Sequence, residues 1–179
     1  MPTFDATSAD CVVYVYTEGV ASAMGHDLAI EATDFSVEVD EDDGSIEAEF
    51  AADSLQVRHA MDDGEPQPGK PPAKDKKKIA RNIRKDVLET KRFPVITFRS
   101  TAVAARDGVL DVEGVLGLHG VEQTISFEAR AVDGATRACV SINQPDFDIT
   151  PYKALLGALK IEPKVDVKIE LPYEVAPAP

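Results

Sequence analysis

Alternation of apolar and polar residues is the sequence feature that most limits how this chain can fold. It is clearest over residues 165–175, where every second residue is apolar and the residues between are charged, apart from Pro172. A period of two is typical of a β-strand with one buried and one solvated face. Pro172 cannot donate a backbone hydrogen bond, so it indicates an edge position or a bulge in this strand.

The same alternation recurs along most of the chain and predicts about eight strands joined by short turns. Besides 165–175, it covers residues 11–17, 26–40, 46–50, 55–57, 96–98, 110–118, 125–131 and 138–142. Within 26–40 the apolar positions change from even to odd numbers, which predicts a β-bulge near Thr33 and Asp34. The expected fold class is therefore all-β, a closed antiparallel barrel. A β-sandwich would give the same alternation and is the alternative.

Two regions interrupt the β pattern. Residues 62–76 are rich in Pro, Gly and Lys and have no apolar period, which predicts a mobile loop. Apolar residues then recur every four positions from Ile79 to Val87, so we expect one amphipathic helix over residues 77–91 that plugs or flanks a barrel end. The apolar run at residues 152–160 indicates a second, shorter helix.

Length and composition indicate a single domain over residues 1–179, with residues 176–179 as a frayed tail. The chain has 44% hydrophobic residues and a formal charge of −13, which excludes disordered and fibrous classes. No apolar run approaches the roughly 20 residues that cross a bilayer. The N-terminus lacks the features of a secretory signal, so the expected location is the cytoplasm, or the periplasm or exterior if the chain is a processed form. A homodimer is left open.

Basic residues gather in one segment of this acidic chain. Residues 70–92 contain ten Lys and Arg against three acidic residues, a local charge of +7. Such a segment could bind the phosphates of a lipid head group, a membrane surface or nucleic acid, although a solvated basic surface is the simpler interpretation. The acidic remainder and the absence of an aromatic platform argue against nucleic acid.

The residues that could carry chemistry form no recognised motif. GxSxG, HExxH, GxGxxG, P-loop and CxxC sequences are absent, and we predict no catalytic residue, metal or cofactor. His26, His59 and His119 lie on different segments without metal-ligand spacing, with His59 expected at the barrel mouth and His119 in a solvated turn. An enzyme using His26 or His59 as a base is the least favoured hypothesis. Cys11 and Cys139 are expected to be free thiols that pack in the interior.

Five segments stand out when they are taken together and in order. They are Gly25-His26-Asp27, residues 52–55, residues 114–121, residues 142–149 and, most specifically, the run RKDVLETKRFPVITFRS at residues 84–100. With this order and spacing, the chain resembles the YceI-like family. The resemblance covers most of the chain. It implies a lipocalin-like barrel that binds a polyisoprenoid or similar amphiphilic lipid.

The function that this resemblance implies is non-catalytic binding or carriage of such a lipid in the barrel interior. Burial of a hydrocarbon contributes roughly 0.8 kcal/mol per CH₂ and needs no directional chemistry. The candidate ligand-binding residues of the interior are Leu28, Ile30, Phe35, Phe50, Phe98, Leu116, Phe127, Phe147, Leu156 and Ile169. The candidates for contact with a polar head are His26, His59, Arg81, Arg84 and Lys85. The alternative is an interaction or stress-associated protein with a filled barrel, which binds a partner through its basic loop and helix.

Overall fold

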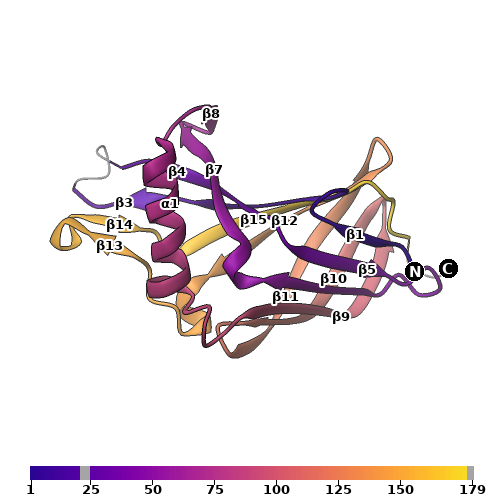
Figure 1. The fold of residues 1–179 in the computed structure, drawn as a ribbon. Helices are drawn as coiled ribbons and strands as arrows, with labels where there is room; N and C mark the ends of the chain where they lie inside the picture. Colours follow the sequence, from indigo (N-terminus) through magenta and orange to yellow (C-terminus); the bar gives the residue numbers. More distant parts are fainter. Residues whose placement is uncertain (21–24, 177–179) are drawn as a thin grey trace.

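The computed structural model describes residues 1–20 and 25–176 of the chain. An antiparallel sheet curls into a barrel, and the helix α1 (Ala73–Asn82) lies across one end (Figure 1). The N-terminus and the end of the described chain both lie at the opposite end. Among the described residues, no helix has the length and apolar character needed to cross a membrane.

Eight chain segments form the barrel wall. In spatial order they are β2 (Asp10–Val15), β4 with β5 (Asp27–Ala32, Phe35–Val39), β6 with β7 (Ile46–Ala51, Leu55–Asp62), β9 (Val95–Arg106), β10 (Val109–Leu118), β11 (Val121–Val132), β12 (Ala135–Asn143) and β15 (Lys164–Leu171). The ring closes because β2 pairs with both β4 and β15. The predicted antiparallel barrel is confirmed, in preference to the sandwich, while β1 (Thr3–Asp5) and β8 (Glu65–Gln67) extend the sheet to twelve labelled strands.

The predicted change of phase near Thr33 and Asp34 is a corner rather than a bulge. The chain leaves β4 after Ala32 and begins β5 at Phe35, so it turns from one part of the wall into another. The adjacent segment turns in parallel through η2 (Ala52–Ser54), and the Thr33 hydroxyl donates a hydrogen bond to the Ser54 carbonyl at 2.9 Å. The β4–β7 ladder does contain an irregular register, but earlier in β4, between the pairs Ala29–His59 and Ile30–Val57.

The predicted amphipathic helix is present, but its bounds differ from 77–91. It begins at Ala73, directly after Pro72, and ends at Asn82, where the turn widens into the π-helical η3 (Ile83–Val87). Pro72 is the N-cap residue, and its ψ of 153° is extended rather than helical, so the helix cannot begin before Ala73. Ile79 and Ile83 pack against a buried cluster of β4 and β7, as expected for a helix that covers a barrel end.

The segment 62–76 is therefore not the uninterrupted loop that its composition predicted. β8 pairs with the end of β7, and the last residues of the segment already belong to α1. Lys residues favour helix formation once Pro72 has set the start, and this outweighs the lack of an apolar period.

The second helix, predicted over 152–160, is wrong. These residues form a hairpin of β13 (Lys153–Ala154) and β14 (Leu159–Ile161), joined by the short turn η5 (Leu155–Gly157) and paired with β3 (Thr17–Glu18). Leu155 and Leu156 have φ of 52° and 55°, a left-handed conformation that cannot continue a right-handed helix. Apolar content alone does not distinguish a helix from such a hairpin.

The two cysteines are free, as expected, but only one of them packs in the interior. Cys11 is buried in the largest apolar cluster, together with Phe35, Val37 and Val112. Cys139 on β12 is exposed because its side chain points outward from the barrel wall.

Candidate functional site: an apolar cavity inside the barrel

A cavity of about 240 Å³ lies inside the barrel. Side chains of β2, β4 to β7, β9 to β12 and β15 line it, and Val87 and Leu88 line it from the segment that follows α1. This follows from the sequence alternation, because residues two apart on each strand face the same interior. An apolar cavity of about 150 Å³ is enough to stay dry and accept a benzene molecule.

The lining is almost entirely hydrocarbon. Apart from the thiol of Cys11, only Thr136 and Gln144 bring polar side-chain atoms to it. The Thr136 hydroxyl donates to the Tyr173 carbonyl at 2.7 Å, and the Gln144 amide donates to the Glu162 carbonyl at 3.0 Å. Burial raises the pKa of Cys11 to about 12, so its thiol stays neutral near pH 7. The cavity therefore suits a hydrocarbon and offers no counter-ion to a charged group.

Phenylalanine rings shape the middle of the cavity. The rings of Phe98 and Phe127 have centroids 5.7 Å apart, and Phe50 stacks on Phe35 at 5.3 Å. Phe98 can take its position because Gly114, on the neighbouring strand, has no side chain. A Cβ atom there would lie 2.5 Å from the ring of Phe98.

Six of the ten predicted interior residues line this cavity. They are Ile30, Phe50, Phe98, Leu116, Phe127 and Ile169. Three others are buried without lining the cavity. Leu28 packs in the apolar cluster beneath α1, and Phe35 stacks on Phe50. Phe147 is buried in a cluster with Leu88. Leu156 is fully exposed, with a relative accessibility of 109%, so its predicted interior position is wrong. The prediction fails because the turn of the β13–β14 hairpin holds Leu156 away from the barrel.

None of the predicted head-group residues lines the cavity. His26 is exposed at the start of β4, and Arg81, Arg84 and Lys85 are exposed along α1 and η3. His59 is half-buried with its Nδ1 3.1 Å from the Ala60 carbonyl oxygen, and the irregular register beside Arg58 turns it away from the cavity. The basic residues nevertheless share an end of the molecule with Val87 and Leu88, which reach the lining.

His119 is not the solvated residue that its turn predicted. The turn between β10 and β11 is there, but the side chain is only 9% exposed. Its Nδ1 lies 3.1 Å from the Phe147 carbonyl oxygen, its Nε2 lies 3.0 Å from a Glu89 carboxylate oxygen, and its ring packs on Phe93. The residue thus connects three segments at the edge of the barrel and has a structural role.

The wall is incomplete between β11 and β12. Their ladder comprises four pairs, from Val132–Ala135 to Ala129–Ala138. Beyond it, residues 121–128 and 139–143 form no ladder with one another in the described structure, and we call this region the β11–β12 gap. Ile125 and Phe127 line the cavity from one side of the gap, and Val140 and Ile142 from the other. Apolar side chains of both strands therefore border the cavity where the backbone ladder is missing.

Sequence reasoning overlooked part of the lining. Val13, Leu55, Leu118, Ile125 and Ile142 all line the cavity and all lie in phase with residues that alternation placed inside. The period-two alternation of these strands was therefore enough to predict that these residues face the interior. Val87 and Leu88 gave no such signal, because only the three-dimensional course of η3 brings them to the barrel.

Within residues 1–20 and 25–176, no group of three His, Cys, Asp or Glu side chains is arranged to hold a metal ion. The lining also contains no imidazole, carboxylate or ammonium group. The arrangement can enclose an apolar molecule, and Cys11 carries the one ionisable side chain among the described lining residues.

Comparison with known proteins agrees with this fold. A family model described as the YceI-like domain matches residues 5–173. The structure is similar to Burkholderia cenocepacia BcnA, with a TM-score of 0.67, 18% identity, and coverage of 93% of this chain and 97% of that chain. It is also similar to a polyisoprenoid-binding domain from Saccharophagus degradans implicated in plant cell wall breakdown, with a TM-score of 0.57, 14% identity, and coverage of 92% and 96%.

A third similar structure is the Campylobacter jejuni YCEI protein, with a TM-score of 0.57, 15% identity, and coverage of 79% of this chain and 81% of that chain. No curated protein matches the sequence. At these identities the neighbouring structures support the fold alone.

Proposed function

The chain belongs to the YceI-like family, and from this membership we propose that it binds an isoprenoid-like or similar amphiphilic lipid with the hydrocarbon tail inside the barrel. The observation that carries the proposal is the cavity of about 240 Å³ with an almost wholly apolar lining. The similar domain from Saccharophagus degradans is described as polyisoprenoid-binding, which supports the same ligand class.

The chemistry of the lining explains why a tail, rather than a head group, is expected inside. Each CH₂ removed from water contributes roughly 0.8 kcal/mol, whereas an unpaired charge in the same place would be strongly unfavourable. The polar head would remain outside. Arg84 and Lys85 are exposed beside the segment whose Val87 and Leu88 reach the cavity, so this end is suited to an anionic head.

The proposed role is binding or carriage without catalysis. Cys11 is the sole ionisable side chain of the lining, and burial keeps its thiol neutral near pH 7. The presence of a cavity also favours lipid binding over the alternative of a filled barrel core. The exposed basic residues of that alternative need no filled core.

Native mass spectrometry of the freshly purified protein, followed by organic extraction, tests this proposal. We expect a discrete adduct whose extracted mass is that of a prenyl or acyl lipid. Farnesol added to stripped protein should raise the unfolding temperature, because a ligand at 100 times its Kd stabilises by about 2.7 kcal/mol. A bare protein mass together with no thermal shift from farnesol or a long-chain fatty acid would refute the proposal.

A further inference from the structure

Exposed apolar residues gather at the end of the molecule that carries α1. Six large hydrophobic residues are exposed in the described structure, and four of them, Val20, Tyr152, Leu155 and Leu156, belong to the β13–β14 hairpin or the end of β3 beside it. Gly19 fits so closely that a Cβ atom would lie 2.5 Å from the Ala158 carbonyl oxygen, which keeps Val20 next to the hairpin turn. We call Val20, Leu155 and Leu156 the apolar tip.

Exposure of the apolar tip to water is unfavourable in free energy. Val20 is 95% exposed, Leu155 55% and Leu156 109%. Both leucines also adopt a positive φ. This conformation costs about 1 to 2 kcal/mol per residue for amino acids other than glycine and asparagine. A turn of this shape would be more stable with glycine or asparagine, so stability of the free protein does not explain these residues.

Two lysines flank the tip. Lys153 and Lys160 are directly opposite each other in the β13–β14 ladder. Like charges in this position are unfavourable by a few tenths of a kcal/mol or more, and Glu18, which lies opposite Lys160 in the β14–β3 ladder, offsets this for Lys160 but not for Lys153. Within the described residues, this end thus combines exposed apolar side chains with Lys153, whose ammonium group forms no ion pair.

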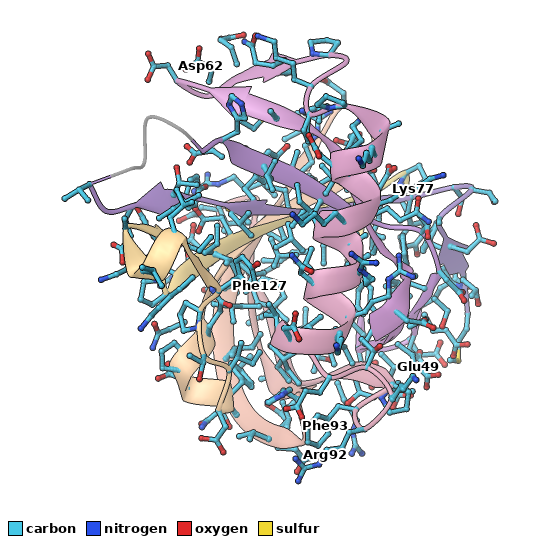
Figure 2. All side chains as sticks on the ribbon, turned by 60° about the vertical axis from the view of Figure 1, so that its left-hand side comes forward. Glu49, Asp62, Lys77, Arg92, Phe93 and Phe127 are labelled. Atoms are coloured by element: carbon cyan, nitrogen blue, oxygen red, sulfur yellow. The ribbon has the colours of Figure 1, made fainter. Side chains whose placement is uncertain are left out.

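The outer face of α1 and η3 continues this charge. Lys74, Lys77, Lys78, Arg81, Arg84 and Lys85 recur at helical spacing, are exposed, and form no ion pair within the described residues; we call them the basic stripe. The Asn82 amide donates to the Tyr152 hydroxyl at 3.1 Å, which joins the helix to the hairpin. Figure 2 looks onto α1, with Lys77 labelled beside it and the hairpin to its left.

From this arrangement we propose that the apolar tip and the basic stripe together dock the protein on an anionic lipid bilayer. The leucines enter the boundary between head groups and acyl chains, and the basic stripe binds the phosphates around them. Amphipathic surfaces of this kind bind by buried apolar area plus attraction to anionic lipids. Each Lys or Arg near such a surface contributes about 1 kcal/mol. An acidic protein partner would account for the charge but not for the exposed leucines.

Flotation of the full-length protein with vesicles tests this. We expect binding to phosphatidylcholine vesicles that contain phosphatidylglycerol, and little binding to phosphatidylcholine alone. Raising the salt concentration from about 0.1 M to about 1 M should weaken binding, because the screening length falls from about 10 Å to about 3 Å. Equal binding to both vesicle types, or no binding to either, would overturn the proposal.

Two variants separate the contributions of the tip and the stripe. L155S/L156S should weaken vesicle binding at least about tenfold, since each buried leucine is worth about 1.5 kcal/mol or more. K77S/R81S/K85S should remove the preference for phosphatidylglycerol. Matched controls are V95S, which removes an exposed apolar residue of β9, and R99S/R130S/K168S, which changes the net charge equally. Unchanged binding by L155S/L156S, with an unchanged unfolding temperature, would contradict insertion of the tip, whatever the barrel contains.

Discussion

Asp166 on β15 is a carboxylate shared by three segments of the barrel wall. It accepts a hydrogen bond of 2.7 Å from the Tyr16 hydroxyl and one of 2.6 Å from the Ser141 hydroxyl. Burial raises the pKa of Asp166, but the hydrogen bonds from Ser141 and Tyr16 outweigh it, and the pKa lies below its ordinary value. Burial and the bond to Asp166 in turn raise the pKa of Tyr16.

The lowered pKa of Asp166 predicts how stability depends on pH. Its contribution is present above the pKa of an unfolded aspartate, about 3.9, and is lost as the pH falls through the lower pKa of the folded state. We expect D166N to lower the free energy of unfolding at pH 7 by about 1 to 3 kcal/mol, because two hydrogen bonds lose their ionised acceptor. Denaturant unfolding at pH 7 and near pH 2.5 measures this.

At the lower pH the difference between D166N and wild type should shrink towards zero. D86N is the control, since Asp86 is exposed on η3 and forms no ion pair within the described residues. A difference that persists unchanged at pH 2.5 would show that the ionised carboxylate is not what stabilises this site.

The residues that sequence reasoning misplaced share a physical cause. Alternation fixes which face a residue takes only while the register is regular. It therefore placed Phe50 and Phe98 correctly but failed at His59, beside the irregular pairing near Arg58. Leu156 was misplaced because hydrophobicity was taken as a sign of burial. His119 lies in the predicted turn, but its buried contacts come from distant segments.

At the scale of elements, β11 and β12 form the least regular part of the wall. Along the gap each is paired on its other side, β11 with β10 and β12 with β15. In the β11–β12 gap they can separate without breaking a ladder between them. If lipid binds in the cavity, as proposed above, this gap is the expected route for its tail.

A cross-link over the gap tests this route. Continuing the ladder past Ala129–Ala138 puts Glu128 opposite the exposed Cys139, so oxidised E128C should form a disulfide that holds the two strands together. We expect uptake of a fluorescent fatty acid, followed by stopped-flow mixing, to slow severalfold and to recover with a reducing agent. K168C is the matched control, because Lys168 pairs with Cys139 across the complete β12–β15 ladder. Equal slowing in both variants would point to entry elsewhere.

The elements themselves were largely predictable, and the exceptions are informative. Strands and the helix have periods of two and about 3.6, so the barrel and α1 could be inferred. The β13–β14 hairpin could not, because its strands are too short to show a period. The bounds of α1 depended on Pro72 and on the widening at Ile83, and neither alters the apolar spacing.

For the whole molecule, the balance between a filled and an open interior decides whether a ligand fits. Small residues on the inner face, such as Ala48 and Ala129, leave space that the phenylalanines do not occupy. Sequence could list these alanines, but it could not show whether their space was filled from across the barrel. That depends on how far the opposite walls lie apart.

Filling this space should separate stability from binding. A48F/A129F places two rings in the cavity, and we expect loss of farnesol binding with a fall in unfolding free energy of about 1 to 3 kcal/mol for each substitution. The thermal shift with farnesol and denaturant unfolding measure the two effects. A104F is the control, since Ala104 is exposed on β9. If the filled variant still binds farnesol as the wild type does, the ligand occupies another site.

Closure of the barrel through β2 and β15 also determines when the molecule can fold. The ladder that completes the ring joins residues near position 12 to residues near position 168, such as Val12 with Lys168. Such long-range pairing is slow, because a long chain must be ordered before its contacts form. During synthesis, β2 must wait for almost the entire chain. Until β15 arrives, β2 and β12 are open edges that can pair with other molecules. Nascent or truncated chains should therefore depend on chaperones for a barrel that, once closed, leaves neither edge free.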